Sequence, residues 1–358
     1  MTEFRDGSKL LAAEEHARKA IDEIANEGGL DEITFESYGP PVWVVSGRDA
    51  IGRKSALHVE YSDDPQALLE EQQAGVALMR QLREHGGQVI DYTRNAWIQP
   101  HPRITASAFV VTQSVFLPTG DVTPVDFGGG VGSMHRAGAE LNLNHLQPLQ
   151  PFTRIRRAAE ALRLMHDEGR PFTAGDLTLR EAVLDSLETH LPTGEKAHQE
   201  MFVLAKEKGR PLVPLLWDVH AGNTRYDAKK VATIFDVPPF VGPAEIDLGR
   251  PFSDWKRFGQ PLSDTQQYLH GYVQAVSPDS APSPTLLPDK EILQHAIVAS
   301  NIAFSSMMLV LAYERASQSK PNEWLLREGE HRLLVIDDPD AQWQPFNTAR
   351  KNQEFAQQ

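Results

Sequence analysis

Three polar residues near the middle of the chain have the types and the spacing that phosphoryl transfer requires. Asp218 and Asn223 lie in the stretch LLWDVHAGNTRY, and Asp236 follows later, directly after the apolar run VATIF. In kinase-type transfer one carboxylate accepts the proton of the attacking hydroxyl, while an amide oxygen and a second carboxylate hold magnesium against the phosphates. Magnesium prefers such hard oxygen ligands. The pattern therefore predicts a phosphoryl-transfer site with Asp218 as the base and Asn223 and Asp236 as metal ligands.

A second candidate is the stretch VDFGGGVGSMH, which spells a kinase metal-binding triplet followed by glycines. Asp126-Phe127-Gly128 comes before Asp218 in the chain, whereas the metal-binding triplet of kinases follows the catalytic loop. The glycines also miss the G-x-G-x-x-G spacing, because Ser133 occupies the last required position. We therefore expect a helix here that ends near His135, with glycines that allow close packing or a loose helix start.

At the loop WDVHAGN a family resemblance can be stated. It resembles the GDxHxGN catalytic loop of aminoglycoside phosphotransferases and choline-kinase-like enzymes, and IFDVPPFVGPAEIDLGRP resembles the family's metal-binding aspartate followed by GxPxxDLA. The resemblance implies that Asp218 is the catalytic base and that Asn223 and Asp236 bind magnesium. It also implies that His220 supports the loop and that Asp247 anchors the C-terminal lobe.

The resemblance covers roughly residues 35–314 and includes a nucleotide-binding hinge. The stretch VVTQSVFLPTG is similar to the hinge of the family, where the backbone around Gln113, Ser114 and Val115 would contact adenine. ATP is therefore the cofactor that the resemblance implies, together with magnesium.

One position departs from the family pattern. The family's third strand carries a lysine that grips the α- and β-phosphates, but aligning KSALHVEY places His58 there. A histidine is shorter and is charged only part of the time near neutrality. Three explanations stay open: Lys54 or Arg53 reaches the phosphates from the preceding turn, His58 does so itself, or the protein binds nucleotide weakly and does not catalyse. Glu71 (or Glu70) occupies the ion-pairing position of the family's lysine-partner helix.

The bulk properties exclude several classes of protein. The chain has 358 residues, a formal net charge of −14 and no cysteine. An acidic surface repels phosphate backbones and anionic lipid, so nucleic acid is not an expected partner. The lack of cysteine removes disulfides and zinc-thiolate sites and suits the cytoplasm. No apolar run approaches the roughly 20 residues that cross a bilayer, so we expect no membrane partner.

The elements that must position these residues fall into two parts. VWVVSG and KSALHVEY predict two antiparallel strands, the stretch from Ser62 onward has helix start signals, and ASAFVVTQSVFLPTG predicts another strand that runs into a turn. Helical patterns dominate from Thr123 onward, including RIRRAAEALRLMHDEG, LREAVLDSLETHL and EKAHQEMFVLAKEKG. We expect an α+β, two-lobed protein-kinase-like fold, with an N-lobe at 1–111 and a mainly helical C-lobe at 112–358 that carries the hinge, the catalytic loop and the acceptor site.

Taken with the resemblance, these patterns imply an ATP- and magnesium-dependent phosphotransferase that acts on a hydroxyl of a small molecule. The acidic charge would attract a cationic acceptor, so an aminoglycoside-type antibiotic is the first hypothesis. The alternatives are a metabolic kinase for an amino alcohol, sugar or homoserine-like substrate, and a nucleotide-binding regulatory protein without transfer activity.

Overall fold

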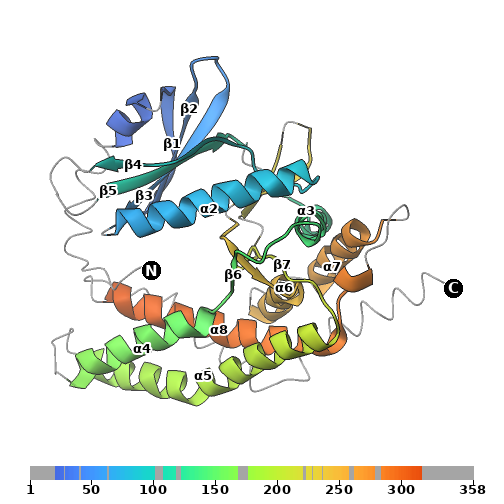
Figure 1. Cartoon of the computed structure of the whole chain (residues 1–358). Coiled ribbons are helices and arrows are strands. Elements are labelled where there is room, and N and C mark those ends of the chain that lie inside the picture. Colours follow the sequence, from blue (N-terminus) through green and yellow to red (C-terminus); the bar gives the residue numbers. More distant parts are fainter. Residues whose placement is uncertain are drawn as a thin grey trace. The chain divides into compact units, whose positions relative to one another are not determined.

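The chain forms two compact units in a computed structural model, whose elements are labelled in Figure 1. Met1–Val122 and Gly222–Pro239 form one, which we call the sheet unit, and Thr123–Ala221 and Phe240–Gln358 form the other, which we call the helical unit. The structure describes residues 21–27, 29–39, 42–62, 64–100, 108–117, 122–167, 176–220, 223–227, 229–235, 237–257, 262–278 and 284–316.

A five-stranded antiparallel sheet is the framework of the sheet unit, with strand order β1-β2-β3-β5-β4 (Figure 1). The strands are β1 (Asp31–Gly39), β2 (Val42–Arg48), β3 (Lys54–Ser62), β4 (Tyr92–Pro100) and β5 (Ala108–Val115). The predicted strands β2, β3 and β5 are therefore present. At the centre of the sheet, His58 of β3 lies opposite Val44 of β2 and Thr112 of β5.

The two faces of β3 have different surroundings because successive side chains of a strand point to opposite faces. Leu57, Val59 and Tyr61 are buried in a cluster with the helical residues 21–27. The other face is directed at α2 (Pro65–Glu84), where Gln72 Nε2 lies 3.4 Å from Glu60 Oε2. By alternation, His58 lies on this second face.

Helix α2 begins as its sequence predicts. Asp64 is the N-cap, its carboxylate accepts a hydrogen bond from the Ala67 amide at 3.1 Å, and Pro65 lies in the first turn. An N-cap oxygen satisfies an amide that has no partner within the helix. Val76, Met79 and Leu82 are buried, so α2 is held against the sheet by an apolar face.

The sheet unit is completed by a short hairpin from a later part of the chain. β8 (Thr224–Tyr226) and β9 (Ala232–Ile234) pair across a turn in which the Asp227 carboxylate accepts amide hydrogen bonds. The Ile234 carbonyl accepts a hydrogen bond from the Ile90 amide at 2.8 Å, and the Ile234 amide donates to the Gln88 carbonyl at 2.9 Å. These bonds are the reason that Gly222–Pro239 belongs to the sheet unit and not to the helical one.

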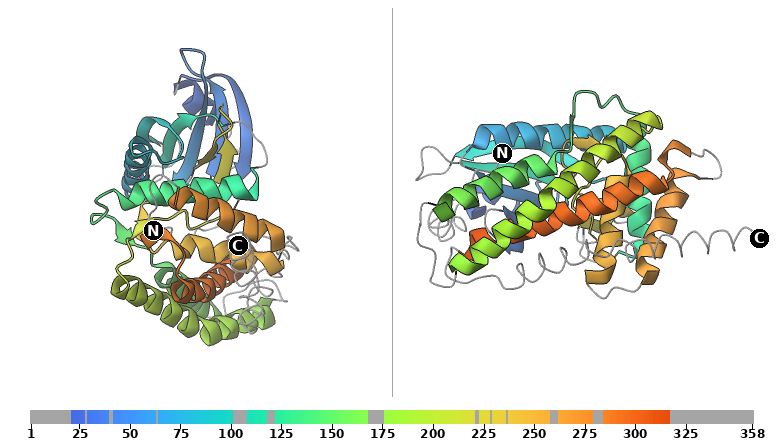
Figure 2. Two further views of the ribbon diagram at one scale, coloured as in Figure 1. Left: turned by 90° about the vertical axis from the view of Figure 1, so that its right-hand side faces the viewer. Right: turned by 90° about the horizontal axis from the view of Figure 1, so that it is seen from below.

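Helices make up most of the helical unit, and Figure 2 shows them from two further directions. They are α3 (Pro124–Ala139), α4 (Pro151–Asp167), α5 (Asp176–Glu207), α6 (Glu245–Arg257), α7 (Leu262–Val276) and α8 (Lys290–Ala316), with the short 3-10 helix η2 (Pro284–Leu286). This unit also has a small sheet of short strands in the order β6-β10-β7. The strands are β6 (Gln147–Pro148), β7 (Val213–Pro214) and β10 (Phe240–Gly242).

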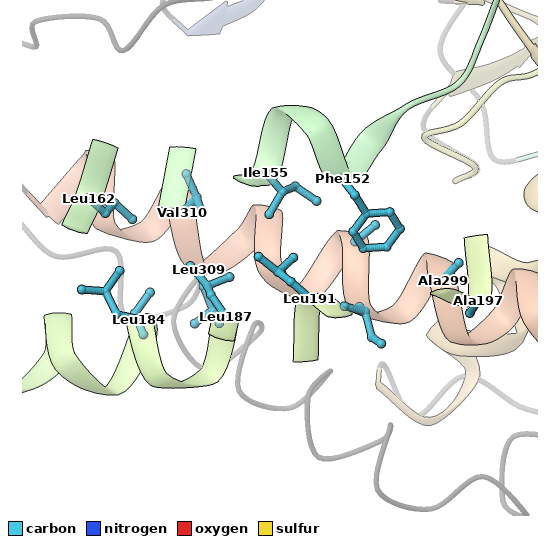
Figure 3. Packing of buried hydrophobic residues seen from close by; sticks show 13 residues of the cluster. Phe152, Ile155, Leu162, Leu184, Leu187, Leu191, Ala197, Ala299, Leu309 and Val310 are labelled. Carbon is cyan, nitrogen blue, oxygen red and sulfur yellow. The ribbon is translucent and has the colours of Figure 1, made fainter. Parts of the chain in front are cut away.

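One hydrophobic core of the helical unit lies between α4, α5 and α8 (Figure 3). Its side chains come from all three helices and include Phe152, Ile155, Leu187, Leu191 and Leu309. Two predicted helical patterns are here one helix, because α5 continues through Pro192. Two residues further on, a Cβ at Gly194 would come within 2.7 Å of Ile302, so close packing against α8 holds α5 at this point.

Helix α8 is apolar enough to need separate comment. Lys290–Val310 has the length and composition of a membrane span, with a mean hydropathy of 1.4, but 72% of that window is buried inside the protein. Polar residues such as His295 and Asn301 interrupt its apolar runs, so the sequence pattern alone does not mark it as a span. A core helix passes the same test, and α8 packs against α4, α5 and α6 as a core helix does.

The glycine-rich stretch singled out in the sequence lies in α3. Thr123 is the N-cap of that helix, and Asp126 lies in its first turn, where its amide donates to the Thr123 hydroxyl at 3.2 Å. The expected helix is therefore present, and it ends at Ala139, beyond His135. A Cβ at Gly128 would collide with the Tyr268 carbonyl of α7, so this glycine serves close helix packing.

Candidate functional site

The loop that carries Asp218 follows β7 and is held in place by a buried carboxylate. Asp247, in the first turn of α6, accepts the Leu216 amide at 2.7 Å and the Trp217 amide at 2.9 Å. Trp217 has a φ of 59°, and the Asp218 amide donates to the Leu216 carbonyl at 2.7 Å. A left-handed conformation is unfavourable for a residue with a Cβ, by about 1 kcal/mol. The two hydrogen bonds to Asp247 therefore fix a turn that the chain would not otherwise favour.

Asp247 is in turn held by a fully buried histidine. His135 Nε2 lies 3.1 Å from Asp247 Oδ2, and its Nδ1 lies 3.1 Å from the Tyr272 hydroxyl. A carboxylate only accepts, so Nε2 donates to Asp247. Burial raises the pKa of Tyr272 well above its usual value, so its hydroxyl stays protonated. The chain from Tyr272 through His135 and Asp247 thus sets the backbone just before Asp218.

Both carboxylate oxygens of Asp218 have cationic or imidazole neighbours. Arg250 Nη1 of α6 lies 2.9 Å from Oδ1, and His220 Nε2 lies 3.2 Å from Oδ2. The Asp218 side chain is 49% exposed, whereas that of Arg250 is 5% exposed. Arg250 therefore lies on the buried side of the carboxylate, and solvent reaches the other side.

These neighbours keep Asp218 ionised. Partial burial raises the pKa of its carboxyl, but the hydrogen bond from His220 and the charge of Arg250 lower it, and the net effect is a pKa below the usual value. An ionised carboxylate with one accessible side is what a base that accepts a hydroxyl proton requires.

The two expected metal ligands are not described equally by the structure. Asn223, in the sheet unit, is 8% exposed and its carbonyl accepts the Phe235 amide at 3.1 Å. Asp236 lies outside the described residues. Within the described part of the chain there is no cluster of three or more histidine or acidic side chains. A carboxamide and a carboxylate, completed by water and phosphate, fit magnesium without such a cluster, so the assignment of Asn223 and Asp236 stays a prediction.

The three residues considered for the phosphate-binding role of the lysine, Lys54, Arg53 and His58, have different surroundings in the structure. Lys54 Nζ lies 3.5 Å from the centre of the Phe116 ring, at the end of β3 that adjoins the end of β5. Arg53 Nε lies 3.1 Å from Asp49 in the preceding turn. His58 is half-buried on the face of β3 that is directed at α2. Of the three, His58 lies at the centre of the sheet, and its place as the counterpart of the lysine stays a prediction.

Glu70 and Glu71 are the two residues expected in the ion-pairing position of α2. Among the described residues, neither forms an ion pair with His58. Glu70 instead accepts a hydrogen bond from Gln66 at 3.0 Å. Glu71 lies on α2 and is half-buried.

The backbone of the predicted hinge takes part in the sheet. The Gln113 carbonyl accepts from the Thr93 hydroxyl at 3.3 Å, and the Val115 amide donates to the Asp91 carbonyl at 2.9 Å. Ser114 pairs with Ala56 of β3. β5 ends at Val115, and the next amide, that of Phe116, donates to the Lys54 carbonyl at 3.1 Å. The adenine-binding role of Gln113, Ser114 and Val115 stays a prediction.

Sequence reasoning missed the residues that hold Asp218 from the helices. Arg250 follows Asp247 by one helical turn, so the i, i+3 spacing would have placed both on one side of α6. Phe304 of α8 carries the Arg250 guanidinium over its ring at 3.5 Å and stacks on Trp217 at 4.8 Å. It is distant in the sequence and gives no local signal.

Solved structures show the same fold. The chain is similar to spectinomycin phosphotransferase APH(9)-Ia, solved with ADP and spectinomycin, with 15% identity, 90% of this chain and 98% of that chain covered, and a TM-score of 0.55. It is similar to amicoumacin kinase hAmiN, solved with AMP-PNP and Ca²⁺, at 13% identity, 91% and 95% coverage and a TM-score of 0.57. It is also similar to an ethanolamine kinase of Plasmodium vivax, at 13% identity, 88% and 85% coverage and a TM-score of 0.55.

No protein-family model matches the sequence, and no curated protein matches it. The structural likeness nevertheless confirms the fold class. The chain has an α+β, two-lobed protein-kinase-like fold, with a small antiparallel sheet in one unit and a mainly helical second unit.

Proposed function

We propose that the protein is an ATP- and magnesium-dependent phosphotransferase that acts on a hydroxyl group of a small molecule. The observation that carries the proposal is the state of Asp218, an ionised, half-exposed carboxylate on a loop fixed by Asp247. The fold supports it, because the structures with the same fold include phosphotransferases and kinases solved with ADP or AMP-PNP.

In the proposed reaction the acceptor hydroxyl binds with its proton directed at Asp218. Its oxygen forms a bond to the γ-phosphorus while the bond from that phosphorus to the bridging oxygen of ADP breaks, and the leaving ADP takes the electron pair. The hydroxyl proton passes to the Asp218 carboxylate. Positioning and charge stabilisation supply most of the catalysis in such transfers.

The remaining predicted site residues have supporting roles in this proposal. Asn223 and Asp236 would hold magnesium, which supplies neutralisation of the phosphate charge when it is bound. His58 would face the phosphates in place of the family's lysine. The adenine ring would meet the backbone around Gln113, Ser114 and Val115. Lys54 would be the alternative contact to the phosphates, and Glu71 would occupy the ion-pairing position on α2.

For the acceptor we propose a cationic antibiotic of the aminoglycoside type, because the net charge of −14 attracts cations. The neighbours named as spectinomycin phosphotransferase and amicoumacin kinase support this class. The ethanolamine kinase supports a second candidate, a metabolic kinase for an amino alcohol. The third hypothesis, nucleotide binding without transfer, is less well supported, because such a protein would have no need for an ionised carboxylate at Asp218.

The test is release of ADP from ATP with a panel of aminoglycosides, amino alcohols, sugars and homoserine. Asp218→Asn should lower turnover of the preferred acceptor by about 10²- to 10⁴-fold, the usual contribution of a positioned base, with an unchanged melting curve. Turnover by Asp218→Asn equal to that of the natural protein would refute the role of Asp218. Stabilisation by ATP without transfer to any acceptor would favour the binding protein.

A further inference from the structure

Arg250 is a buried cation that the family pattern does not call for. It lies one turn after Asp247 on α6, and its side chain is only 5% exposed. A buried charge is costly unless it is paired and hydrogen-bonded. Asp218 is a charged partner of Arg250, and its Oδ1 lies 2.9 Å from Arg250 Nη1. A residue with this cost, directed at this carboxylate, needs an explanation beyond packing.

The guanidinium is also fixed from its other side. Its carbon lies 3.5 Å from the centre of the Phe304 ring, and Phe304 is fully buried. The same ring stacks on Trp217 with 24° between the planes. A cation over an aromatic ring is held electrostatically as well as by packing. Arg250 is therefore anchored by α8 before it meets Asp218.

This arrangement makes the two oxygens of Asp218 unequal. Oδ1 is engaged on the buried side by Arg250, whereas Oδ2 lies 3.2 Å from His220, whose side chain is 44% exposed. The carboxylate is thereby held in one orientation, with Oδ2 on the side that solvent and an acceptor can reach.

We propose that Arg250 is the positioning residue of the phosphotransferase site, which holds Asp218 Oδ1 so that Oδ2 accepts the proton of the acceptor hydroxyl. The inference rests on the proposed function. Arg250 itself transfers no proton, because a guanidinium stays charged at any pH at which the protein is folded.

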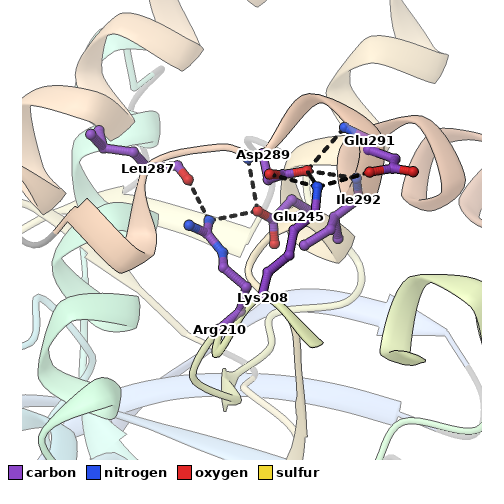
Figure 4. A network of polar contacts seen from close by, with 7 residues as sticks. All are labelled: Lys208, Arg210, Glu245, Leu287, Asp289, Glu291 and Ile292. Carbon is purple, nitrogen blue, oxygen red and sulfur yellow. Dashed lines mark hydrogen bonds and ion pairs between the residues drawn. The ribbon is translucent and has the colours of Figure 1, made fainter. Parts of the chain in front are cut away.

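A second arginine in an ion pair, partly buried, provides a matched control. Arg210 Nη2 lies 2.7 Å from Glu245 and also donates to the Leu287 carbonyl, next to the contacts of Lys208 with Asp289 and Glu291 (Figure 4). Arg210 is 10% exposed and Glu245 is 1% exposed. This pair joins the end of α5 to the starts of α6 and α8, and in the part of the chain that the structure describes it has no ion pair with Asp218. Loss of Arg210 therefore reports what removing such an arginine does to the stability of the helical unit without breaking the Arg250–Asp218 contact.

The experiment compares Arg250→Met, Arg250→Lys and Arg210→Met by kcat, KM for ATP and the pH dependence of kcat/KM with the best acceptor of the panel. Arg250→Met keeps the apolar stem over Phe304 but lacks the charge. We expect it to lower kcat about 10- to 100-fold, the effect of a misplaced reacting group, with little change in KM for ATP. Arg250→Lys should recover part of the loss. A fourth variant, Arg250→Ala, lacks the whole side chain, and added guanidinium should partly restore its kcat.

The pH profile separates positioning from folding. Among the described residues, Arg250 from α6 and His220 from its own loop face Asp218, with Asp247 behind the Leu216 and Trp217 amides. Arg250 lowers the pKa of Asp218, so its loss raises that pKa and should move the acid limb of kcat/KM to higher pH. Arg210→Met should lower the melting temperature without moving that limb.

Each outcome is decisive. Wild-type kcat and an unmoved acid limb in Arg250→Met would overturn the inference, as would an equal loss of kcat in Arg210→Met. If Arg250→Met does not fold, Arg250→Lys and the guanidinium rescue of Arg250→Ala decide by the same pH readout, and the lack of both effects refutes the inference. If Asp218→Asn also turns over normally, the proposed function has failed, which is a different result from normal turnover in Arg250→Met alone.

Discussion

At the scale of single residues, Trp217 is the point where the backbone gives Asp218 its direction. Its φ of 59° is unusual for an aromatic residue, and two interactions offset the strain. The Asp247 carboxylate accepts its amide, and its ring stacks on Phe304. The Arg250 guanidinium lies over the Phe304 ring. Phe304 therefore contacts both the residue that sets the backbone before Asp218 and the arginine that holds its side chain.

His58 leads to a test at the same scale. His58→Lys places a fixed positive charge on the strand face directed at α2, so we expect KM for ATP to fall about tenfold, the effect of 1.4 kcal/mol from one charge-assisted contact. His58→Gln, which has no charge, should raise KM or leave it unchanged. Steady-state kinetics at fixed acceptor concentration measures both.

Lys54→Met is the matched control for that test. Because the Lys54 ammonium lies over the Phe116 ring, its loss should change KM for ATP less than the changes at His58 do. A large rise in KM for Lys54→Met together with no response at His58 would show that Lys54 contacts the phosphates.

The candidate site is predictable from sequence only where its residues are close in the chain. Asp218, His220 and Asn223 form a spaced motif that a single pattern contains. Arg250 and Phe304 contact the motif from two helices that follow much later. A local sequence pattern cannot predict such contacts, because only the tertiary packing of the helices brings these side chains to the loop of Asp218.

At the scale of elements, the packing of α3 on α7 explains the glycines of these two helices. A Cβ at Gly128 would meet the Tyr268 carbonyl, and one at Gly271 would meet the Val125 carbonyl. At Gly132 it would come within 2.8 Å of Ala275 Cβ. The two helices therefore approach each other backbone to backbone, which only residues without a side chain allow. This contact also brings His135 of α3 to Tyr272 of α7.

Alanine substitutions in α3 test this role with an internal control. Gly128→Ala should destabilise the protein by about 1 to 3 kcal/mol, because the added methyl group forces the helices apart. Gly129→Ala should be neutral or stabilise by up to about 1 kcal/mol, since the nearest atom is 3.9 Å from its Cβ position and alanine favours helix. Urea unfolding measures both. Equal effects would mean that backbone propensity, and not the α3–α7 contact, explains the glycines.

The elements were predictable in proportion to the regularity of their patterns. The caps and apolar face of α2 and the alternation in β2, β3 and β5 are clear in the sequence. The outer strands β1 and β4 were not predicted. Both have register shifts in their pairing, and a bulge interrupts the alternation by which a strand is recognised. Each lies at an edge of the sheet, where less of the strand must be apolar.

At the scale of the whole molecule, nucleotide binding should be visible as stability. A ligand that binds only the folded state at 100 times its Kd adds about 2.7 kcal/mol. ATP should therefore raise the melting temperature, and more so with magnesium than without it. Asn223→Ala should lose the magnesium-dependent part and keep the rest. Differential scanning fluorimetry with ATP, with and without magnesium, measures the two parts, and an unchanged magnesium response in Asn223→Ala would contradict its role as a ligand.

The path of the chain has a consequence for how such a protein can be divided. The polypeptide passes from the sheet unit to the helical unit after Val122, returns at Gly222, and leaves again after Pro239. A fragment that stops at Val122 would lack the hairpin whose Ile234 bonds to Gln88 and Ile90. A single gene fusion or a single proteolytic cut therefore cannot exchange the sheet unit as a module. Asp218 and Asn223 lie five residues apart on one stretch of chain although they belong to different units.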